Sequence, residues 1–579
     1  MYFISKLFLG LFVAVIVSHL TVLLQYPEEN SLFLLKDYFL AVSSGYVELT
    51  DVSKIGFGVS LFFIIIFLLI KEPSASRLGF AKYARKKDIK TAKLNSTNGL
   101  FVGKAMYPPL GDTLTPTSFN SLNVDLACNE PLSWGVFAPP GTGKTTAIVI
   151  PTLLKSKNSF IINDPKGEIF EKTASTRLNF SKVLRFDPMQ KYGKGITFNP
   201  FSKNLIPEDI RKVFNYINQI ANVLIQDSEK GGDAYFTGNA RVIFIFVASY
   251  FVLKNGKTSL PEISSKIFEE KDVSSIFEAM IEDVEEYSAE LEDDLFITED
   301  EEEIKQIKAR IKLAGNVKKQ GVASLSSAGA EQAWASIIST LTPILQVYAT
   351  DELIKEATEG ENEVDILTFK ETSKSLYMIV PDEAKKVLYP LIRLLVEISA
   401  SKVQSAKFED PKKVILTYLI DEFPRLGQMK ELLELPAVSR GQGVTLCLIA
   451  QSLKQIEIIY TKDHAENLFS LLSYWYIFKQ GDSTTAKKIS DMIGKSREKK
   501  KSVSYDTKGH FAKSSSYSIS DDYMPLVTPE EILSLDRDFG LVLATENASR
   551  PILVKHNFYY KNKKLLKIME ENKELKKLL

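Results

Sequence analysis

The chain has 579 residues, which is long enough to hold more than one folded domain. Its residues are 45% hydrophobic and 25% charged, a balance typical of globular proteins that excludes a largely disordered chain. Its 72 lysines and arginines balance its 72 aspartates and glutamates, so any binding to nucleic acid would depend on local basic patches and not on net charge.

Two apolar segments near the N-terminus, residues 7–25 and 55–70, are predicted to cross a membrane. A cleaved signal peptide is the alternative for the first segment, but it lacks a small-x-small cleavage site and its apolar core is long for one. Acidic residues predominate in the short loop between the segments, whereas lysines and arginines follow the second one, from Lys71 to Lys93. This asymmetry predicts that the N-terminus and the large C-terminal part are both cytoplasmic and that the loop is periplasmic.

Residues 138–146 read APPGTGKTT, the pattern of a phosphate-binding loop. A short apolar strand is expected before it, at 134–137, and an apolar helix after it, as the pattern requires. Glycines let the backbone turn tightly and approach a phosphate closely, and the amides at the start of the helix face the anion. Lys144 is expected to reach the β- and γ-phosphates of ATP, and Thr145 to bind Mg²⁺. The predicted nucleotide-binding residues are Ala138, Pro139, Pro140, Gly141, Thr142, Gly143, Lys144, Thr145 and Thr146.

Two residues depart from the common form of this loop. Ala138 occupies the first position, where Gly is usual, so a slightly different turn into the loop is expected. Pro151 lies inside the helix that should follow, where it removes one backbone hydrogen bond and is predicted to kink the helix.

Several apolar runs end in polar residues, as buried parallel strands do when their carboxyl ends carry chemistry. The runs at 159–162 and 183–186 are followed by Asn163-Asp164 and Asp187, and the run at 414–420 by Asp421-Glu422. Asp421 could hold magnesium, and Glu422 could orient and deprotonate the attacking water. The alternative is an ordinary turn from strand to helix with a capping aspartate.

The run at 444–450 is a further expected strand, and it ends at Gln451. A glutamine there could sense the γ-phosphate, although it could also simply cap the next helix. Arg440 lies just before this strand and could reach a neighbouring subunit's site to neutralise transition-state charge. The alternative for Arg440 is an ordinary solvated surface arginine.

Residues 205–345 show helical periodicity and contain few β-rich runs. Residues 304–313 form an amphipathic, basic helix candidate, whereas 282–303 hold thirteen acidic side chains and no basic one. Acidic side chains repel a phosphate backbone. The acidic stretch could be a solvated face or flexible insertion, or a docking site for a basic partner, so the choice between DNA and protein stays open.

Residues 494–516 are rich in Lys and Ser and are predicted to form a mobile basic loop. Such a loop could track phosphates if it lined a channel, or it could be a soluble surface loop. Residues 561–579 are a Lys/Glu/Leu helix candidate, expected to pack on the protein or bind a partner. Cys128 and Cys447 are expected to be buried thiols of a reducing compartment.

Together these motifs resemble those of the TraG/TraD coupling proteins of type IV secretion systems, the motors that feed DNA or proteins into a secretion channel. The resemblance covers most of the chain after the second apolar segment, includes the unusual Pro151, and is most specific at the acidic motif. The matching segments are LGFAKYA at 78–84, APPGTGKTT at 138–146 with IPTLL at 150–154, NDPKGE at 163–168, LIDEFPRLG at 419–427, IAQSL at 449–453 and LVTPEEI at 526–532.

The resemblance implies an α/β fold, with a RecA-like P-loop NTPase core and an inserted all-α domain, preceded by two transmembrane helices. It implies a homo-hexameric ring in the bacterial inner membrane, with ATP and Mg²⁺ as cofactors. It supports the roles given above to Lys144, Thr145, Asp421, Glu422 and Gln451, and Arg440 falls where the family's trans arginine is expected. The expected parts are a membrane anchor at 1–72, a nucleotide-binding domain at 73–204 and 346–560, the inserted domain at 205–345, and a C-terminal helical tail at 561–579.

The expected function is that of a coupling ATPase, which recruits single-stranded DNA with its relaxase, effector proteins, or both, and drives them to the secretion channel. Its partners would be channel components and the relaxase–DNA complex or effectors, with non-specific binding of single-stranded DNA. An FtsK-like translocase of double-stranded DNA is one alternative, but it usually needs more spans and a C-terminal winged-helix reader, for which little room follows residue 560. A non-hydrolysing membrane receptor or scaffold is another, but it has no physical need for Lys144, Glu422 and Gln451 together.

Overall fold

The computed structural model describes residues 81–579 apart from 108–119, 227–233, 270–272, 329–330, 363 and 506–514, together with Leu40, Ser43, Ser44 and Gly58. Contacts divide the chain into two units, Met1–Phe80 and Ala81–Leu579. The two predicted membrane spans lie outside the described residues except for Gly58, so the transmembrane anchor stays a prediction.

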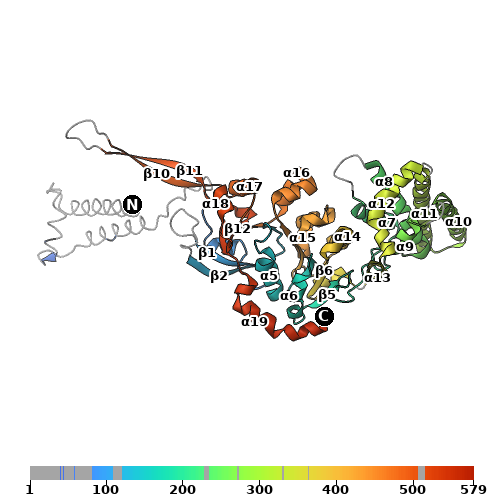
Figure 1. Cartoon of the computed structure of the whole chain (residues 1–579), viewed down its shortest axis with the longest axis horizontal. Helices are drawn as coiled ribbons and strands as arrows, with labels where there is room; N and C mark the ends of the chain where they lie inside the picture. Colours follow the sequence, from blue (N-terminus) through green and yellow to red (C-terminus); the bar gives the residue numbers. More distant parts are fainter. Residues whose placement is uncertain are drawn as a thin grey trace. The chain divides into compact units, whose positions relative to one another are not determined.

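A large mixed sheet forms the centre of Ala81–Leu579 (Figure 1). Within the described residues it has 11 strands, in the order β2-β1-β13-β12-β9-β3-β8-β7-β4-β6-β5. Neighbouring strands are antiparallel from β2 to β9 and parallel from β9 to β5. The α/β fold class predicted from the sequence is therefore confirmed. The strands are β1 (Leu100–Tyr107), β2 (Asn120–Cys128), β3 (Trp134–Phe137), β4 (Ser159–Asp164), β5 (Lys182–Phe186), β6 (Lys374–Ile379), β7 (Leu416–Ile420), β8 (Val444–Ala450), β9 (Tyr474–Ile477), β12 (Phe539–Ala544) and β13 (Ile552–Lys555).

The central parallel strands are buried on both faces, which explains their continuous apolar sequences. Every residue of β3, β7 and β8 is buried. On β8, Leu446 and Leu448 belong to the cluster of buried residues that includes α14 and α16, whereas Cys447 belongs to a second cluster that includes residues of α5 and α6. Both cysteines, Cys128 and Cys447, are free and buried, as predicted. The helices packed on this core include α5 (Ile150–Lys155), α6 (Glu168–Arg177), α14 (Lys385–Ser405), α15 (Lys430–Gln442), α16 (Leu453–Leu471), α17 (Ser483–Ile493) and α18 (Pro529–Ser534).

The strand order brings separate motifs to one edge of the sheet. β3 pairs with β8, β8 with β7 and β7 with β4, all parallel. Parallel neighbours have their carboxyl ends at the same edge. Ala138, Gln451, Asp421 and Asn163 therefore lie side by side, although they are far apart in sequence.

Helices occupy the chain between β5 and β6. Among the described residues, α8 alone is long and apolar enough to cross a membrane, with a mean hydropathy of 1.6. Its Ile243, Phe244 and Phe246 are fully buried, and it packs against α7, α9, α11 and α12 as a core helix. The boundaries expected for an inserted domain, 205–345, stay a prediction. The helices are α7 (Ile210–Leu224), α8 (Ala234–Asn255), α9 (Leu260–Ile267), α10 (Val273–Ile297), α11 (Glu301–Ala328), α12 (Glu331–Thr350) and α13 (Glu352–Thr358).

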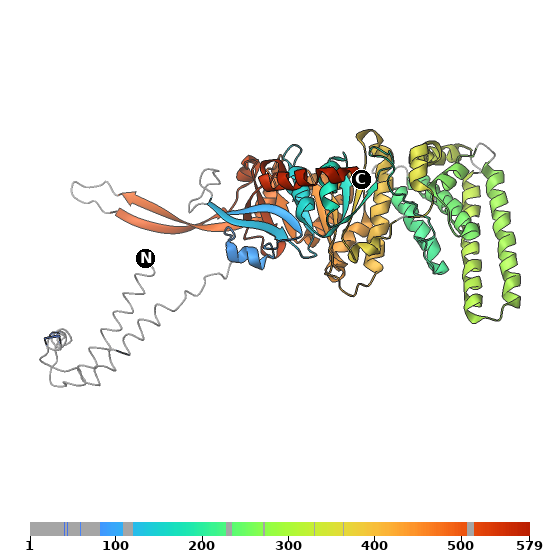
Figure 2. The same ribbon diagram turned by 90° about the horizontal axis from the view of Figure 1, so that it is seen from below.

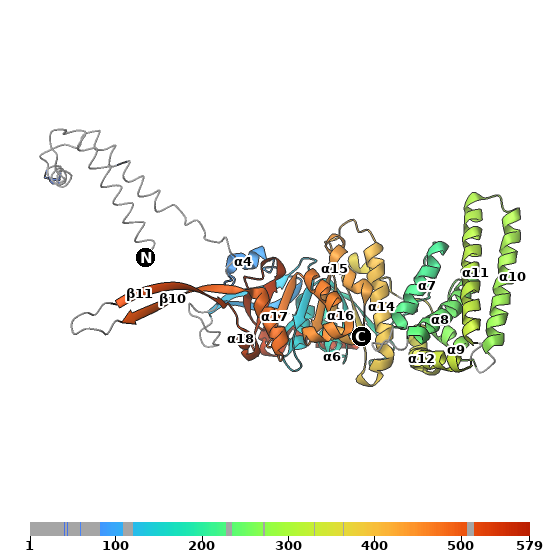
Figure 3. The same cartoon turned by 90° about the horizontal axis from the view of Figure 1, so that it is seen from above.

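The acidic stretch 282–303 lies on two long helices that run side by side, α10 and α11 (Figure 3). It is helical on both sides of a short link, so it is not a flexible insertion. Some of its carboxylates pair within the helical region, since Asp283 contacts Lys254 and Glu285 contacts Lys318. The predicted basic helix at 304–313 continues within α11.

The prediction of a mobile loop at 494–516 is wrong for the described residues 495–505 and 515–516, while 506–514 lie outside the described residues. Lys495–Tyr505 and Ser515–Pro525 form β10 and β11, a separate antiparallel two-stranded sheet (Figure 1). Lys499 lies opposite Asp521, and Lys495 opposite Pro525. Backbone hydrogen bonds join the two strands. Half-buried strands are predicted from an alternation of apolar and polar residues, and these polar strands lack that alternation.

The C-terminal tail packs on the helix that follows the phosphate loop (Figure 2). It consists of α19 (Lys563–Glu571) and a final 3-10 helix, Lys573–Leu578. Leu565 is fully buried against Ile150 and Leu154 of α5. The packing role expected for this segment is thus observed within the chain.

Candidate functional site

The loop after β3 has the backbone of a phosphate-binding loop. Gly141 and Gly143 have φ angles of 75° and 85°, a left-handed region that disfavours side chains. The loop begins at Ala138, which is fully buried and whose N–H donates to Ala450 O at 3.0 Å. This bond ties the loop to the end of β8. Thr142 closes the turn, since its hydroxyl donates to Pro139 O at 2.7 Å.

The helix after the loop is irregular where the sequence predicts a kink. Thr145–Val149 form a π-helical turn, and α5 follows with Pro151 in its first turn. The wider π turn accommodates a proline, whose nitrogen cannot donate and whose ring crowds the preceding turn.

Lys144, Thr145 and Asp421 meet at the edge of the sheet. Lys144 Nζ is 2.8 Å from Asp421 Oδ1, and the Thr145 hydroxyl donates to Asp421 Oδ2 at 3.0 Å. Asn163 Nδ2 donates to the backbone oxygen of Asp421 at 2.7 Å, so β4 fixes the end of β7. The structure thus brings together the loop and the acidic motif, as the sequence analysis expects.

Glu422 adopts a strained backbone beside this group. Its φ and ψ are 54° and 39°, a left-handed conformation that costs a non-glycine residue about 1–3 kcal/mol. Its carboxylate contacts Arg425 Nη1 at 3.0 Å and lies 3.9 Å from Lys144 Nζ. These cations hold the side chain toward the loop.

Further positive charge surrounds Glu422. Burial lowers the pKa of Lys385, as do the nearby charges of Arg425 and Lys166, whereas Glu422 raises it. Arg425, Lys166 and Glu422 therefore each lie close enough to Lys385 to act on it electrostatically. Such a concentration of cations favours an anionic ligand.

The residues fit the expected nucleotide and magnesium. Lys144 Nζ, Asp421 Oδ1 and Asn163 Oδ1 are buried but form no hydrogen bond of good geometry in the described part, even though the first two are in ionic contact. Buried polar atoms normally have partners. A phosphate would supply acceptors to the lysine, and a hydrated cation would supply donors to the two oxygens.

The predicted site residues Gln451 and Arg440 are not seen in contact with Lys144, Thr145 or Asp421 among the described side chains. Gln451 follows β8, and its Oε1 accepts from Gln455 Nε2 at 3.2 Å. Ser452, not Gln451, caps α16, which removes helix capping as the reason for a glutamine at 451. Arg440 lies near the end of α15, and its side chain is outside the described part of the chain.

Two acidic residues that end strands have local structural roles. Burial raises the pKa of Asp164 to about 6, and Asp164 Oδ2 accepts from the Phe170 N–H at 2.8 Å at the start of α6. Asp187 accepts from the Tyr192 N–H at 2.9 Å. Within the described residues, no hydrogen bond or ion pair joins either carboxylate to Lys144, Thr145 or Asp421.

Two residues at the site, Arg425 and Phe558, were not predicted from the sequence. Arg425 lies in the acidic motif, three residues after Glu422, a spacing that could have indicated the ion pair. Phe558 packs its ring against the phosphate loop, since a Cβ at Gly143 would lie 2.6 Å from Phe558 Cε1. No local pattern links Phe558 to a loop that precedes it by most of the chain.

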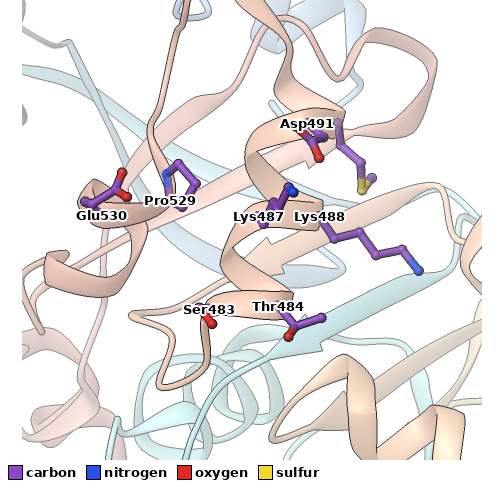
Figure 4. Close-up of a pocket in the computed structure, with 8 residues that line it drawn as sticks. Ser483, Thr484, Lys487, Lys488, Asp491, Pro529 and Glu530 are labelled. Carbon is purple, nitrogen blue, oxygen red and sulfur yellow. The ribbon is translucent and has the colours of Figure 1, made fainter.

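A surface hollow of about 780 Å³ lies elsewhere, between α17 and α18 (Figure 4). Lys487, Lys488, Asp491 and Glu530 line it. None of its lining residues belongs to the phosphate loop or the acidic motif.

A phosphate loop after β3, an acidic pair after β7 and one strand between them form an α/β fold with the motifs of a P-loop nucleotide-binding protein, and this arrangement fits a RecA-like NTPase. Residues 82–578 match the family described as "Type IV secretory system Conjugative DNA transfer", and the chain belongs to this family. The resemblance inferred from the motifs is confirmed.

Relatives of known name agree with this assignment. The chain is 24% identical over 489 residues to "Conjugal transfer protein TraG" of Escherichia coli, and the match covers 79% of this chain and 71% of the relative. It is 27% identical over 471 residues to "Protein VirD4" of Rhizobium radiobacter. That match covers 80% of this chain but 62% of the relative, so the chain spans less than two thirds of VirD4.

Solved structures share the fold. The unbound bacterial conjugative coupling protein TrwBdeltaN70 matches with a TM-score of 0.56 at 16% identity, over 83% of this chain and 94% of that chain. TrwB in complex with ADP and Mg²⁺ matches with a TM-score of 0.54 at the same identity and coverage. At this identity the likeness concerns the α/β fold.

Proposed function

We propose that this protein is a membrane-anchored ATPase that acts as a coupling protein of a type IV secretion system. The observation that carries the proposal is the meeting of Lys144, Thr145 and Asp421, where Lys144 Nζ, Asp421 Oδ1 and Asn163 Oδ1 are buried without a hydrogen bond of good geometry. ATP and Mg²⁺ are the proposed cofactors, and the TrwB complexes with ADPNP and with ADP and Mg²⁺ support them.

Different residues of the site have different roles in the transfer of the γ-phosphoryl group to water. The glycine-rich loop and Lys144 bind the phosphates, while Thr145 and Asp421 hold the cation. Mg²⁺ would neutralise charge on the phosphate oxygens. A γ-phosphate also competes with Glu422 for Lys144, 3.9 Å away, and so releases the carboxylate to take a proton from the attacking water.

Three other residues complete this proposal. Arg425 keeps Glu422 in place through the ion pair at 3.0 Å. Gln451, at the end of the strand between β3 and β7, senses whether the γ-phosphate is present. Arg440 acts in trans in a homo-hexamer, at the site of the neighbouring subunit.

The proposed setting is the bacterial inner membrane, with two spans and both termini in the cytoplasm. The substrate is single-stranded DNA with its relaxase, and the conjugative family to which the chain belongs supports DNA. Protein effectors are the second candidate, because the acidic side chains of α10 and α11 favour a basic protein over a phosphate backbone.

The ATPase proposal is tested on the full chain in detergent with Glu422→Gln and Lys144→Ala. Glu422→Gln should bind MgATP as the wild type does but lose hydrolysis by about a hundredfold or more, because general-base catalysis contributes at least that much. Lys144→Ala should bind MgATP weakly. Normal turnover in Glu422→Gln would remove Glu422 from the mechanism, and unchanged affinity in Lys144→Ala would refute the binding site.

The substrate is tested by the ATPase rate with single-stranded DNA or with a basic protein, at low and high salt. Stimulation by DNA that fades with salt supports a motor that contacts phosphates. Stimulation by the basic protein alone would favour effector export.

A further inference from the structure

An aromatic stack lies beside the phosphate loop, in the segment that follows β13. Phe558 is buried, and its ring fills the space that a side chain at position 143 would need. Tyr560 stacks on Phe558, with ring centroids 5.5 Å apart and planes at 27°. The turn Tyr559–Lys561 also contacts the π turn Thr145–Val149, so the stack adjoins both the loop and the helix that follows it.

Phe558 is held firmly on several sides. The His556 ring meets it edge-on at 5.6 Å and itself stacks on Phe478 at 4.1 Å. Burial lowers the pKa of His556 to about 3, so this ring is neutral at physiological pH. Lys561 Nζ lies 5.0 Å from the Phe558 ring and is fixed by an ion pair with Asp538 at 2.8 Å.

Tyr560 differs from the rings behind it because it is 51% exposed. Single exposed aromatic residues are common on protein surfaces and need no explanation by themselves. This one is supported from behind by a buried ring that touches the loop glycine. The Tyr559 ring meets Tyr560 edge-on at 5.6 Å, so a second ring also positions it. The exposed half of the Tyr560 side chain therefore offers an aromatic surface beside the loop proposed to bind the phosphates.

We propose that Tyr560, supported by Phe558, is the platform on which the base of the bound nucleotide stacks. The inference rests on the proposed function, since it places the base of the ATP whose phosphates the loop binds. Stacking on an aromatic ring tolerates different bases, because every base has a π face. The platform should therefore contribute affinity for a nucleotide without choosing strongly between adenine and guanine.

The test distinguishes binding of the base from binding of the phosphates. Binding of MgATP and of magnesium tripolyphosphate, which has no base, is measured by calorimetry on the full chain in detergent. Tyr560→Ala should weaken MgATP by about tenfold, equivalent to about 1.4 kcal/mol, and leave tripolyphosphate unchanged. Tyr560→Phe should restore the wild-type affinity because it keeps the ring. Tyr235→Ala, which removes an exposed tyrosine of α8, is the matched control and should bind both ligands normally.

A second measurement gives a spectroscopic readout. In Tyr560→Trp, MgATP should change the fluorescence of the new indole, whereas tripolyphosphate should not. The inference is overturned if Tyr560→Ala binds MgATP normally, or if it loses affinity for both ligands equally. If the wild type binds neither ligand and Lys144→Ala changes nothing, the proposed function fails and the platform fails with it.

Discussion

Two glycines of the same loop should respond differently to the same substitution. Gly141 and Gly143 both have positive φ, so Ala at either position costs about 1–2 kcal/mol in backbone strain. Around Gly141 a new Cβ would meet nothing within 4 Å. At Gly143 it would lie 2.6 Å from Phe558 Cε1 and 3.0 Å from Thr146 Oγ1.

The difference between the two substitutions measures the contact with Phe558. Because this ring is packed against His556 and Lys561, it cannot easily move away. Overpacking of this kind costs about 1–3 kcal/mol in addition to the backbone strain. Gly143→Ala should therefore lower the free energy of unfolding by about 2–5 kcal/mol in total. Gly141→Ala, with strain alone, is the matched control.

The assay is urea unfolding of the full chain, followed by tryptophan fluorescence, since Trp134 is buried in the strand that leads into the loop. Phe558→Leu, which narrows the side chain, should reduce the additional cost of Gly143→Ala by about 1 kcal/mol in a double-mutant cycle. Equal costs at the two glycines, or no coupling to Phe558→Leu, would refute the reasoning.

Two further predictions concern buried basic side chains, Arg177 and His556. The guanidinium of Arg177 is fully buried and donates to the backbone oxygens of Leu153, Ser156 and Asn158, so Arg177→Met should lower the free energy of unfolding by about 3 kcal/mol or more in a urea titration. The exposed Arg211→Met is the control, and an unchanged midpoint for Arg177→Met would contradict the argument. The pKa of His556 falls from 6.5 to about 3 on folding because of burial, so the unfolded chain binds more protons and stability should fall as pH drops below 6.5. His556→Gln should flatten this fall and His464→Gln should not, and a slope that persists in His556→Gln would exclude His556 as its origin.

Some of the candidate site could be read from sequence because its determinants are local. A glycine with positive φ, a lysine at the start of a helix and a carboxylate at the end of an apolar strand depend on neighbours within a few residues. The loop at 138–146, the strand that precedes Asp421 and the irregular helix at Pro151 were predictable for this reason. Their roles in catalysis stay proposals.

Other features depend on which strands pair, and pairing joins segments that are distant in sequence. Only the order β3-β8-β7-β4 brings Lys144 against Asp421 and places Asn163 behind it. Likewise, the path of the chain after β13 brings Phe558 to Gly143.

The pair of strands β10 and β11 shows most clearly what could not be predicted from the sequence alone. Its strands are rich in Lys and Ser, and the sequence predicts a loop, because polar strands show no buried face. Only pairing with the partner strand decides that this segment is extended. Local backbone sterics and burial patterns thus fix the phosphate loop and the central strands of this protein, while the meeting of the loop with the acidic motif and the aromatic stack comes from long-range packing.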